Sequence, residues 1–171
     1  MNGVLSRQDI RHLLQRTPPI IEDFIDLESQ LQPNGIDLTL REIAMLETPG
    51  KIAVSNNERQ VSALARLIFD GLGFIDLIPS VYIVTYNEIV HLPNNVMALA
   101  QPRSSLLRCG VNVHTAVWDA GYSGRSQSLM VVHNSQGFRL QRNARIIQLV
   151  FFWLNGETEG YHGAYQKENI S

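Results

Sequence analysis

The stretch PRSSLLRCGVNVHTAVWDAGYSG, residues 102–124, decides the fold of this chain. Its first half places Arg103 beside two hydroxyls, Ser104 and Ser105, between a predicted strand and a short helical turn. Outward-pointing N–H groups at a helix start, serine hydroxyls and a guanidinium fork all bind oxyanions. This half therefore predicts an oxyanion site. A serine-capped helix with solvated arginines is the plainer alternative.

The second half places a carboxylate three residues before an aromatic ring. Gly121 and Gly124 lie on either side of Tyr122, and glycine lets a backbone approach a flat ligand closely. We expect a tight hairpin with a pocket inside it, in which backbone groups read a base edge and Tyr122 packs against a sugar ring. A plain turn with an aspartate cap is the alternative.

Two further motifs lie outside this stretch. Asp37 follows Gln-Pro-Asn-Gly-Ile, and Gln148 lies in Ala-Arg-Ile-Ile-Gln-Leu, so each is a polar residue on an otherwise apolar strand. Such groups need a hydrogen-bond partner or a ligand once they are buried. Taken separately, both are more often structural than functional.

Around these motifs the chain reads as short strands separated by turn signals. Residues 35–43, 81–86, 96–100, 111–117, 129–132 and 146–152 are the predicted strands. The two alternating phases of residues 81–86 suggest a strand buried on both faces, and residues 60–69 fit either a helix or a strand. Ser6 and Asp9 fit a capping box and predict a helix over residues 6–15, which Pro18 and Pro19 would stop.

The pattern predicts one mainly β domain over residues 1–171. We divide it into an N-terminal helix and extension over residues 1–30, a β core over 31–155, and a C-terminal tail or lid over 156–171. A compact fold of many short strands has edges to hide, and oligomerisation is one way to hide them.

Composition excludes several classes of protein. A net charge of −2 gives no basic field for a nucleic acid polymer or an anionic membrane, so any polyanionic ligand needs local donors. The single cysteine, Cys109, excludes an internal disulfide and is expected to be a small buried residue. No apolar run suits a signal peptide or a membrane span, so we expect a cytoplasmic protein.

The order of the motifs is more specific than any one of them. Asp37-Leu, Pro-Arg-Ser-Ser-Leu, Asp-x-x-Tyr-x-Gly and Arg-Ile-x-Gln-Leu, in this order, resemble the trimeric dUTPase / dCTP deaminase superfamily from about residue 31 to residue 166. The N-terminal helix, the form of the first motif and the tail are most similar to the deaminases and to archaeal-type dUTPases. The resemblance implies a distorted β-barrel (β-clip) homotrimer with active sites at the subunit interfaces.

The resemblance also implies roles for individual residues. Asp119 would hold and activate the attacking water, and Tyr122 would lie under the deoxyribose and disfavour a 2′-hydroxyl. Asp37 would lie near the water shell of a Mg²⁺ ion that the triphosphate and waters hold, without a direct protein ligand. The residues expected to face the phosphates are Arg103, Ser104, Ser105 and Gln148.

The C-terminal tail departs from the Gly-rich arm, with Arg and Phe, that closes many dUTPases. It contains Tyr165, which could stack on the base, followed by Gln166, a second candidate substrate contact. Lys167 could reach a phosphate, and His162 is read as a solvated tail residue.

The choice between deaminase and pyrophosphatase depends on one strand. Deaminases of this family place a glutamate ten positions past the aspartate, where this chain has Leu129, or Val131 if the hairpin is two residues longer. Neither side chain can transfer a proton. Hydrolysis needs only a positioned water, a carboxylate base and cations on the phosphates. The sequence therefore favours hydrolysis of dUTP to dUMP and pyrophosphate.

Arg108 complicates this choice, because it keeps the spacing of an arginine that supports the deaminase centre. We count it among the candidate substrate contacts, but interpret it as inherited scaffold or as a charge-pairing residue at the trimer interface. The alternatives are a dCTP deaminase or bifunctional deaminase–dUTPase, and a non-catalytic deoxynucleotide-binding regulator.

Overall fold

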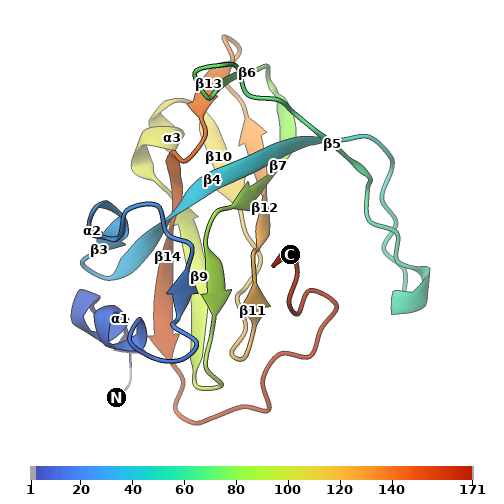
Figure 1. Ribbon diagram of the computed structural model, residues 1–171. Helices are drawn as coiled ribbons and strands as arrows, with labels where there is room; N and C mark the ends of the chain where they lie inside the picture. Colours follow the sequence, from blue (N-terminus) through green and yellow to red (C-terminus); the bar gives the residue numbers. More distant parts are fainter. Residues whose placement is uncertain (1–2, 171) are drawn as a thin grey trace.

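A curled nine-stranded sheet forms the body of the protein, whose computed structural model describes residues 3–170 (Figure 1). Its order is β1 (Gly3–Val4), β14 (Arg145–Trp153), β4 (Gly35–Leu46), β7 (Ser80–Tyr86), β12 (Gln127–Val132) and β10 (Val111–His114). β3 (Leu31–Gln32) and β5 (Leu64–Arg66) pair with β4, and β9 (Val96–Pro102) pairs with β14. All the pairings are antiparallel.

Two small sheets and three short α-helices complete the fold. One sheet has the order β11 (Ser123–Gly124), β8 (Ile89–His91) and β2 (Ile21–Glu22), and the other pairs β13 (Phe138–Gln141) with β6 (Phe74–Leu77). The helices are α1 (Arg7–Leu13), α2 (Leu27–Gln30) and α3 (Ser104–Arg108), with a 3₁₀ turn, η1, at Asn56–Glu58. The mainly β prediction is confirmed. The predicted division of the chain stays a prediction, and residues 1, 2 and 171 lie outside the described range.

The predicted strands form, with shifted ends. The first continues to Leu46, the strand predicted over 111–117 ends at His114, and the ambiguous residues 60–69 contain the short strand β5. Two-sided burial of β7 is wrong. Tyr82, Val84 and Tyr86 are buried, whereas on the opposite face Val81 is 40% exposed and Ile83 lines an open cavity, because this chain covers that face of β7 only in part.

The capping box at the N-terminus is confirmed. Ser6 Oγ accepts from Asp9 N at 3.3 Å, and Asp9 Oδ2 accepts from Ser6 N at 2.8 Å. α1 ends at Leu13, two residues before the predicted end, and buries Ile10 and Leu13 against the sheet.

β4 is buried on both faces, and one of these faces carries polar side chains. Ile36, Leu38 and Leu40 belong to the hydrophobic core, and the alternation of a strand turns Asp37 and Thr39 to the opposite face. Both residues are also buried there, at 1% exposure each. Two polar side chains of β4 therefore require partners inside the protein.

Glu88, which is fully buried, is the partner of Thr39. Its carboxylate accepts from Thr39 N at 2.8 Å, from Thr39 Oγ1 at 2.6 Å and from Gln30 Nε2 at 2.7 Å. Gln30 Nε2 also donates to the carbonyl of Asp37 at 2.8 Å, so this network supports the strand segment that carries Asp37. Burial raises the pKa of Glu88.

We expect Glu88→Leu to lower the free energy of unfolding by about 2–4 kcal/mol, because buried donors are left without an acceptor. Denaturant unfolding at one fixed protein concentration measures the change. The control is Glu157→Leu at an exposed position, expected to stay within about 0.5 kcal/mol of the unsubstituted protein. A loss for Glu88→Leu no larger than that of the control would contradict the structural role.

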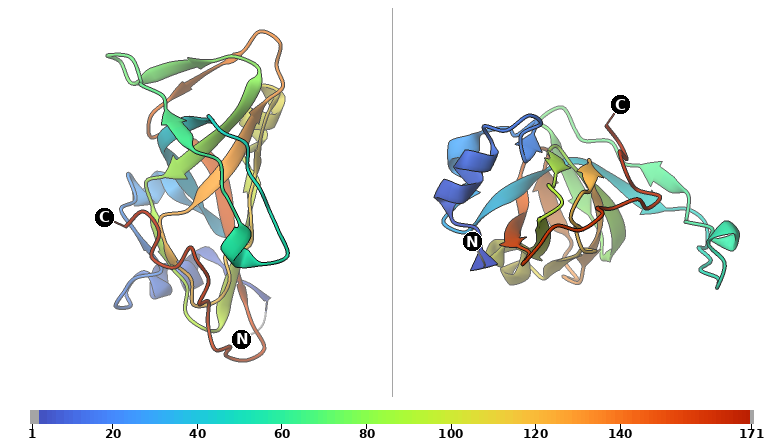
Figure 2. Two further views of the ribbon diagram at one scale, coloured as in Figure 1. Left: turned by 90° about the vertical axis from the view of Figure 1, so that its right-hand side faces the viewer. Right: turned by 90° about the horizontal axis from the view of Figure 1, so that it is seen from below.

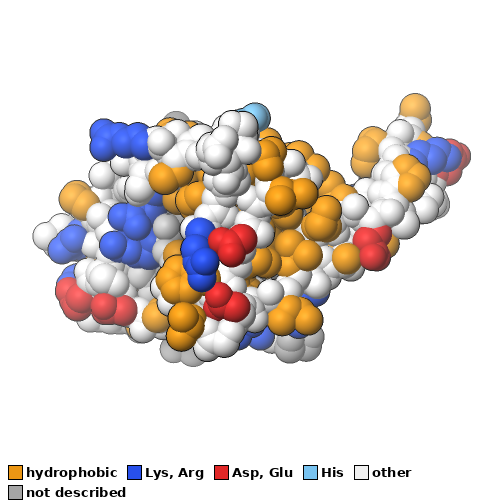
Figure 3. Space-filling view, turned by 90° about the horizontal axis from the view of Figure 1, so that it is seen from above, with side chains coloured by type: hydrophobic (Ala, Val, Ile, Leu, Met, Phe, Trp, Pro, Cys, Tyr) orange, Lys and Arg blue, Asp and Glu red, His pale blue; other side chains and the backbone are white. Residues whose placement is uncertain are grey.

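Residues 47–63 form an arm that projects from the body (Figure 2). A bridge between Lys51 and Gln60 joins its two sides, while Ile52 is 82% exposed and Val61 63%. Hydrophobic side chains gather on the arm and on the body at its base (Figure 3). Apolar surface of this kind marks a contact with another molecule.

The expectation that Cys109 is buried is wrong, because it follows α3 on the outside of the fold and is exposed. Within residues 3–170, no helix has the length and apolar character to span a membrane.

Candidate active site

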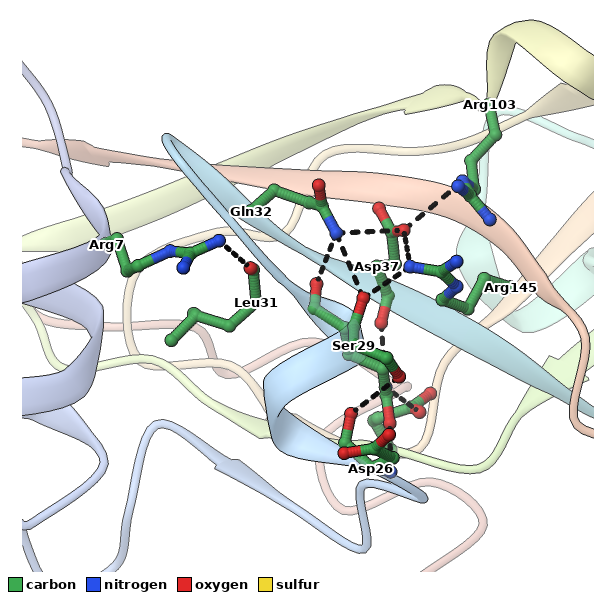
Figure 4. A network of polar contacts seen from close by, with 10 residues as sticks. Arg7, Asp26, Ser29, Leu31, Gln32, Asp37, Arg103 and Arg145 are labelled. Carbon is green, nitrogen blue, oxygen red and sulfur yellow. Dashed lines mark hydrogen bonds and ion pairs between the residues drawn. The ribbon is translucent and has the colours of Figure 1, made fainter.

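An arginine cluster surrounds Asp37 (Figure 4). Asp37 Oδ2 lies 3.2 Å from Arg103 Nε and 3.3 Å from Arg145 Nη1, and Gln32 Nε2 donates to it at 3.4 Å. Burial raises the pKa of Asp37, and the two guanidinium groups oppose that rise. Strand pairing sets Gln148 on β14 opposite Asp37. We use the name arginine cluster for Asp37, Arg103, Arg145 and Gln148.

The two serines of the first motif lie in the first turn of α3, directly after Arg103. β9 ends at Pro102 and α3 begins at Ser104, as the sequence predicts. Arg103 occupies the N-cap position without a side-chain capping bond, so the serine-capped alternative is not observed. Ser104 and Ser105 are exposed and available to a ligand.

Gly35 explains how Gln148 fits. A Cβ atom at Gly35 would lie 2.5 Å from the carbonyl oxygen of Leu149 and 3.0 Å from Gln148 Nε2. Only glycine leaves space at this position for the Leu149 carbonyl and the Gln148 side chain. Gly35 of the first motif is therefore required by the packing of β4 against β14.

Asp119 and Tyr122 are joined by a tight turn. Tyr122 N donates to Asp119 O at 3.0 Å, and Gly121 has φ +82°, a conformation that favours glycine. The predicted hairpin is wrong in its pairing. Trp118 forms a bridge with Ala98 of β9, whereas Ser123 and Gly124 pair with β8, so two different edges hold the ends of the turn.

A cavity of about 760 Å³ lies beside this turn. Asp119 and Tyr122 form one wall together with residues of the segment 114–118, Ile83 of β7 and Gln127–Leu129 of β12 form another, and the arm and the C-terminal tail also contribute. Asp119 is exposed, so its carboxylate is accessible to water and ligand. The carboxylates that line the cavity are Asp119 and Glu168, and the β12 residues among its lining contain none. The pocket was expected inside a hairpin; the structure instead has a cavity beside the turn, with Asp119 and Tyr122 in its lining.

The tail approaches the turn from outside and contributes three side chains to the cavity, Tyr161, Tyr165 and Glu168. Tyr165 is 43% exposed, and the Arg59 guanidinium carbon lies 5.4 Å from its ring centroid. The amide of Gln166 instead bonds backbone groups of the turn, accepting from Ser123 N at 2.8 Å and donating to Gly121 O at 2.9 Å. The substrate contacts proposed for both residues stay predictions.

Glu168 is the site residue that the sequence did not indicate. Its Oε1 accepts from the Tyr122 hydroxyl at 2.8 Å, and burial raises its pKa. A single glutamate in a polar tail has no periodicity and no motif spacing, so no sequence signal was available to find it.

Within a single chain, the predicted phosphate-binding residues lie apart from the cavity beside Asp119. Neither the arginine cluster nor Ser104 and Ser105 line the cavity. Trp118, next to Asp119, pairs with Ala98, and Arg103 is five residues further along β9 and its continuation. That corresponds to roughly 16 Å of extended chain. Arg108, at the end of α3, is exposed and outside the cavity lining.

In the described part of the chain, residues 3–170, no three or more His, Cys, Asp or Glu side chains are grouped to hold a metal ion. Asp37 is already paired with two arginines, which disfavours a direct bond to a cation. The exposed hydroxyls and guanidinium groups fit a ligand that arrives with its own metal, as a nucleoside triphosphate does.

Comparison with known proteins gives one consistent picture. The dCTP deaminase-like family profile matches residues 4–154. The protein of Methanosarcina acetivorans named probable deoxyuridine 5′-triphosphate nucleotidohydrolase is 52% identical over 167 residues, 97% of this chain and 98% of its own. A protein of the same name from Archaeoglobus fulgidus is 50% identical over 168 residues, 98% of each chain.

Among solved structures, the 2′-deoxycytidine 5′-triphosphate deaminase of Agrobacterium tumefaciens superposes with a TM-score of 0.67 at 23% sequence identity. The match covers 89% of this chain and 48% of the deaminase chain, so this chain spans about half of that protein. At this identity the likeness shows a shared fold.

Proposed function

Because the chain belongs to the dCTP deaminase-like family, we propose that it hydrolyses dUTP to dUMP and pyrophosphate with the help of Mg²⁺. The observation that carries the proposal is the chemistry of the cavity. An exposed carboxylate, Asp119, lies beside Tyr122, while β12 presents Gln127, Ser128 and Leu129, which cannot shuttle a proton to a base. The names of the archaeal relatives support the same reaction.

In this reaction Asp119 accepts a proton from a water that it orients toward the α-phosphorus. A bond forms between the water oxygen and that phosphorus, the bond to the bridging oxygen breaks, and pyrophosphate leaves with the electron pair. Positioning and charge stabilisation supply most of the catalysis in phosphoryl transfer. Asp37 would lie near the water shell of a Mg²⁺ ion brought by the triphosphate, and the ion would supply charge neutralisation.

The phosphate contacts come from Arg103, Ser104, Ser105 and Gln148 of a second copy of the chain. Two observations support this part of the proposal. The arginine cluster and the cavity are separated within one chain, and apolar side chains of the arm are exposed beside the cavity. A closed ring of three copies would place each cluster against the cavity of its neighbour and cover these surfaces.

The test is a pair of product assays on the same preparation. Pyrophosphate release from dUTP without ammonia release from dCTP is the expected result. Ammonia release from dCTP would identify a deaminase, or a bifunctional enzyme if both products form. Nucleotide binding without either product would identify a regulator.

Arg108→Ala is expected to keep dUTP turnover within about threefold of the unsubstituted enzyme. The side chain is exposed at the end of α3, and the glutamate that such an arginine would support is missing from β12. Steady-state turnover measures the effect, with Arg103→Ala as the matched arginine removal that should impair it strongly. A hundredfold fall for Arg108→Ala, with oligomeric state preserved, would instead show that Arg108 contacts the reacting phosphates.

A further inference from the structure

We propose that Glu168 is a positioning residue which fixes the Tyr122 ring and so sets the preference of the site for deoxyribose over ribose. The inference rests on the proposed function, in which Tyr122 lies under the sugar of the substrate. It assigns to the C-terminal tail a part in choosing the sugar.

Three contacts hold the Tyr122 ring. Its hydroxyl donates to Glu168 Oε1 at 2.8 Å, and the ring of Tyr161 meets it edge-on, with centroids 5.8 Å apart and planes at 68°. Beneath it, a Cβ atom at Gly124 would lie 2.5 Å from the Tyr122 oxygen, so the glycine of the motif is what lets the ring lie there. Tyr122 is 5% exposed, and the remaining surface belongs to the wall of the cavity.

Glu168 is the only one of these constraints that carries a charge. Burial raises the pKa of Tyr122, which keeps the proton on the phenol. The hydroxyl is therefore the donor and the carboxylate the acceptor, an arrangement that is stronger and more directional than a bond between neutral groups. Without it, Tyr161 and Gly124 still restrict the ring and Ser126 lies within hydrogen-bond reach of its hydroxyl, but no charged acceptor fixes its polar end.

The backbone of the tail places Glu168 independently of its side chain. Lys167 N donates to Ser123 O at 2.7 Å, and Arg125 N donates to Glu168 O at 2.9 Å. The Gln166 side-chain amide also bonds the backbone of Gly121 and Ser123 in the preceding turn. Removal of the Glu168 carboxylate therefore leaves the tail docked, and its effect on Tyr122 can be tested without removing the tail.

Backbone strain supports the same assignment. Lys167 and Asn169, on either side of Glu168, have φ values of 63° and 51°. This left-handed conformation is uncommon for lysine, although asparagine adopts it more readily, and such positions gather at functional sites. Here the two left-handed residues turn Glu168 toward the cavity between them.

The consequence for substrate choice is steric. A 2′-hydroxyl is excluded when the wall beneath the sugar cannot move, because a shift of about 1 Å would make room for one oxygen atom. A ring whose hydroxyl is bonded to a charged acceptor gives way less readily than a ring that has lost this bond. Loss of the Glu168 acceptor should therefore admit UTP more than it impairs dUTP.

The test compares kcat/KM for dUTP and UTP in the full-length protein. Glu168→Ala is expected to lower the dUTP-to-UTP ratio about tenfold, the effect of one charge-assisted hydrogen bond. Tyr122→Phe, which removes the donor and keeps the ring, should lower the ratio by a similar factor. The double variant should be no worse than either single one, because both substitutions remove the same interaction. Glu168→Gln should restore most of the ratio, since its amide oxygen still accepts.

Glu159→Ala, at an exposed carboxylate on the same tail, is the control and should leave the ratio unchanged. An unchanged ratio in Glu168→Ala, or additive losses in the double variant, would overturn the inference while the protein remains a dUTPase. Loss of turnover in Glu168→Gln with an unchanged ratio would overturn it as well, by showing proton transfer at Glu168. If the unsubstituted protein neither binds nor hydrolyses dUTP, the proposed function itself fails.

Discussion

Asp119→Asn is expected to reduce pyrophosphate release from dUTP by ~10²–10⁴-fold, the usual contribution of a general base. The substitution keeps the shape of the side chain and its capacity for hydrogen bonds, but removes the charge that accepts a proton from water. The turn itself should survive, because the bond that closes it uses the backbone oxygen of Asp119 and not the carboxylate.

Nucleotide binding should be kept or improved in the same variant. A carboxylate near a triphosphate repels it, so its neutral replacement removes repulsion from the ground state. Turnover that falls while affinity holds is the pattern of an interaction needed mainly in the transition state. Single-turnover rates and calorimetric binding of a non-hydrolysable dUTP analogue measure the two quantities separately.

The matched control is Asp76→Asn, the same chemical change at an exposed position on β6, which should leave the rate unchanged. If Asp119→Asn keeps turnover within about threefold of the unsubstituted enzyme, Asp119 is only a turn residue. The base would then have to be sought at Asp37, although that carboxylate is buried and already paired with Arg103 and Arg145.

Arg103→Ala is the second substitution with a large expected effect, a loss of ~10²–10³-fold in turnover, because a cation that stabilises phosphate charge is removed. Two inactive variants, Asp119→Asn and Arg103→Ala, should then restore each other when they assemble together. If each site takes Asp119 from one copy and Arg103 from its neighbour, random mixing in equal amounts leaves roughly a quarter of the sites intact. Recovery of about that share of wild-type turnover is the expected result.

The mixing experiment needs co-refolding or co-expression, and light scattering should show a trimer in every sample. Each variant treated alone in the same way is the control and should stay inactive. Absence of recovery in mixed trimers would place both residues of a site on one chain. A monomer that hydrolyses dUTP at full rate would remove the shared site altogether.

Local chemistry was readable from the sequence because it depends on neighbours along the chain. The capping box of α1 needs only Ser6 and Asp9, three residues apart, and it forms as expected. The step from β9 into α3 at Arg103 and Ser104, and the turn from Asp119 to Tyr122, are local in the same sense. Alternation likewise predicted the apolar face of β4 that carries Ile36, Leu38 and Leu40.

What depends on contacts between distant segments was missed or misjudged. The hairpin expected around Gly121 does not form, because β8 and β9 offer the ends of the turn two separate edges. Val81 was expected to be buried, but alternation reports that a face is apolar and not whether the same chain covers it. Cys109 is exposed because it follows a helix only five residues long on the outside of the sheet.

The sequence by itself determined a mainly β fold and the residue types of the proposed site, since strand alternation, caps and turns are encoded within a few residues. Only the tertiary structure decided how those residues meet. Pairing of β4 with β14 sets Asp37 opposite Gln148 and within reach of Arg103, more than sixty residues away along the chain. The C-terminal tail folds back onto the turn between Asp119 and Tyr122, and this places Glu168 in hydrogen-bond contact with Tyr122. Contacts between such distant residues depend on which strand edges and surfaces remain free once the core has formed. A local sequence pattern does not contain this information.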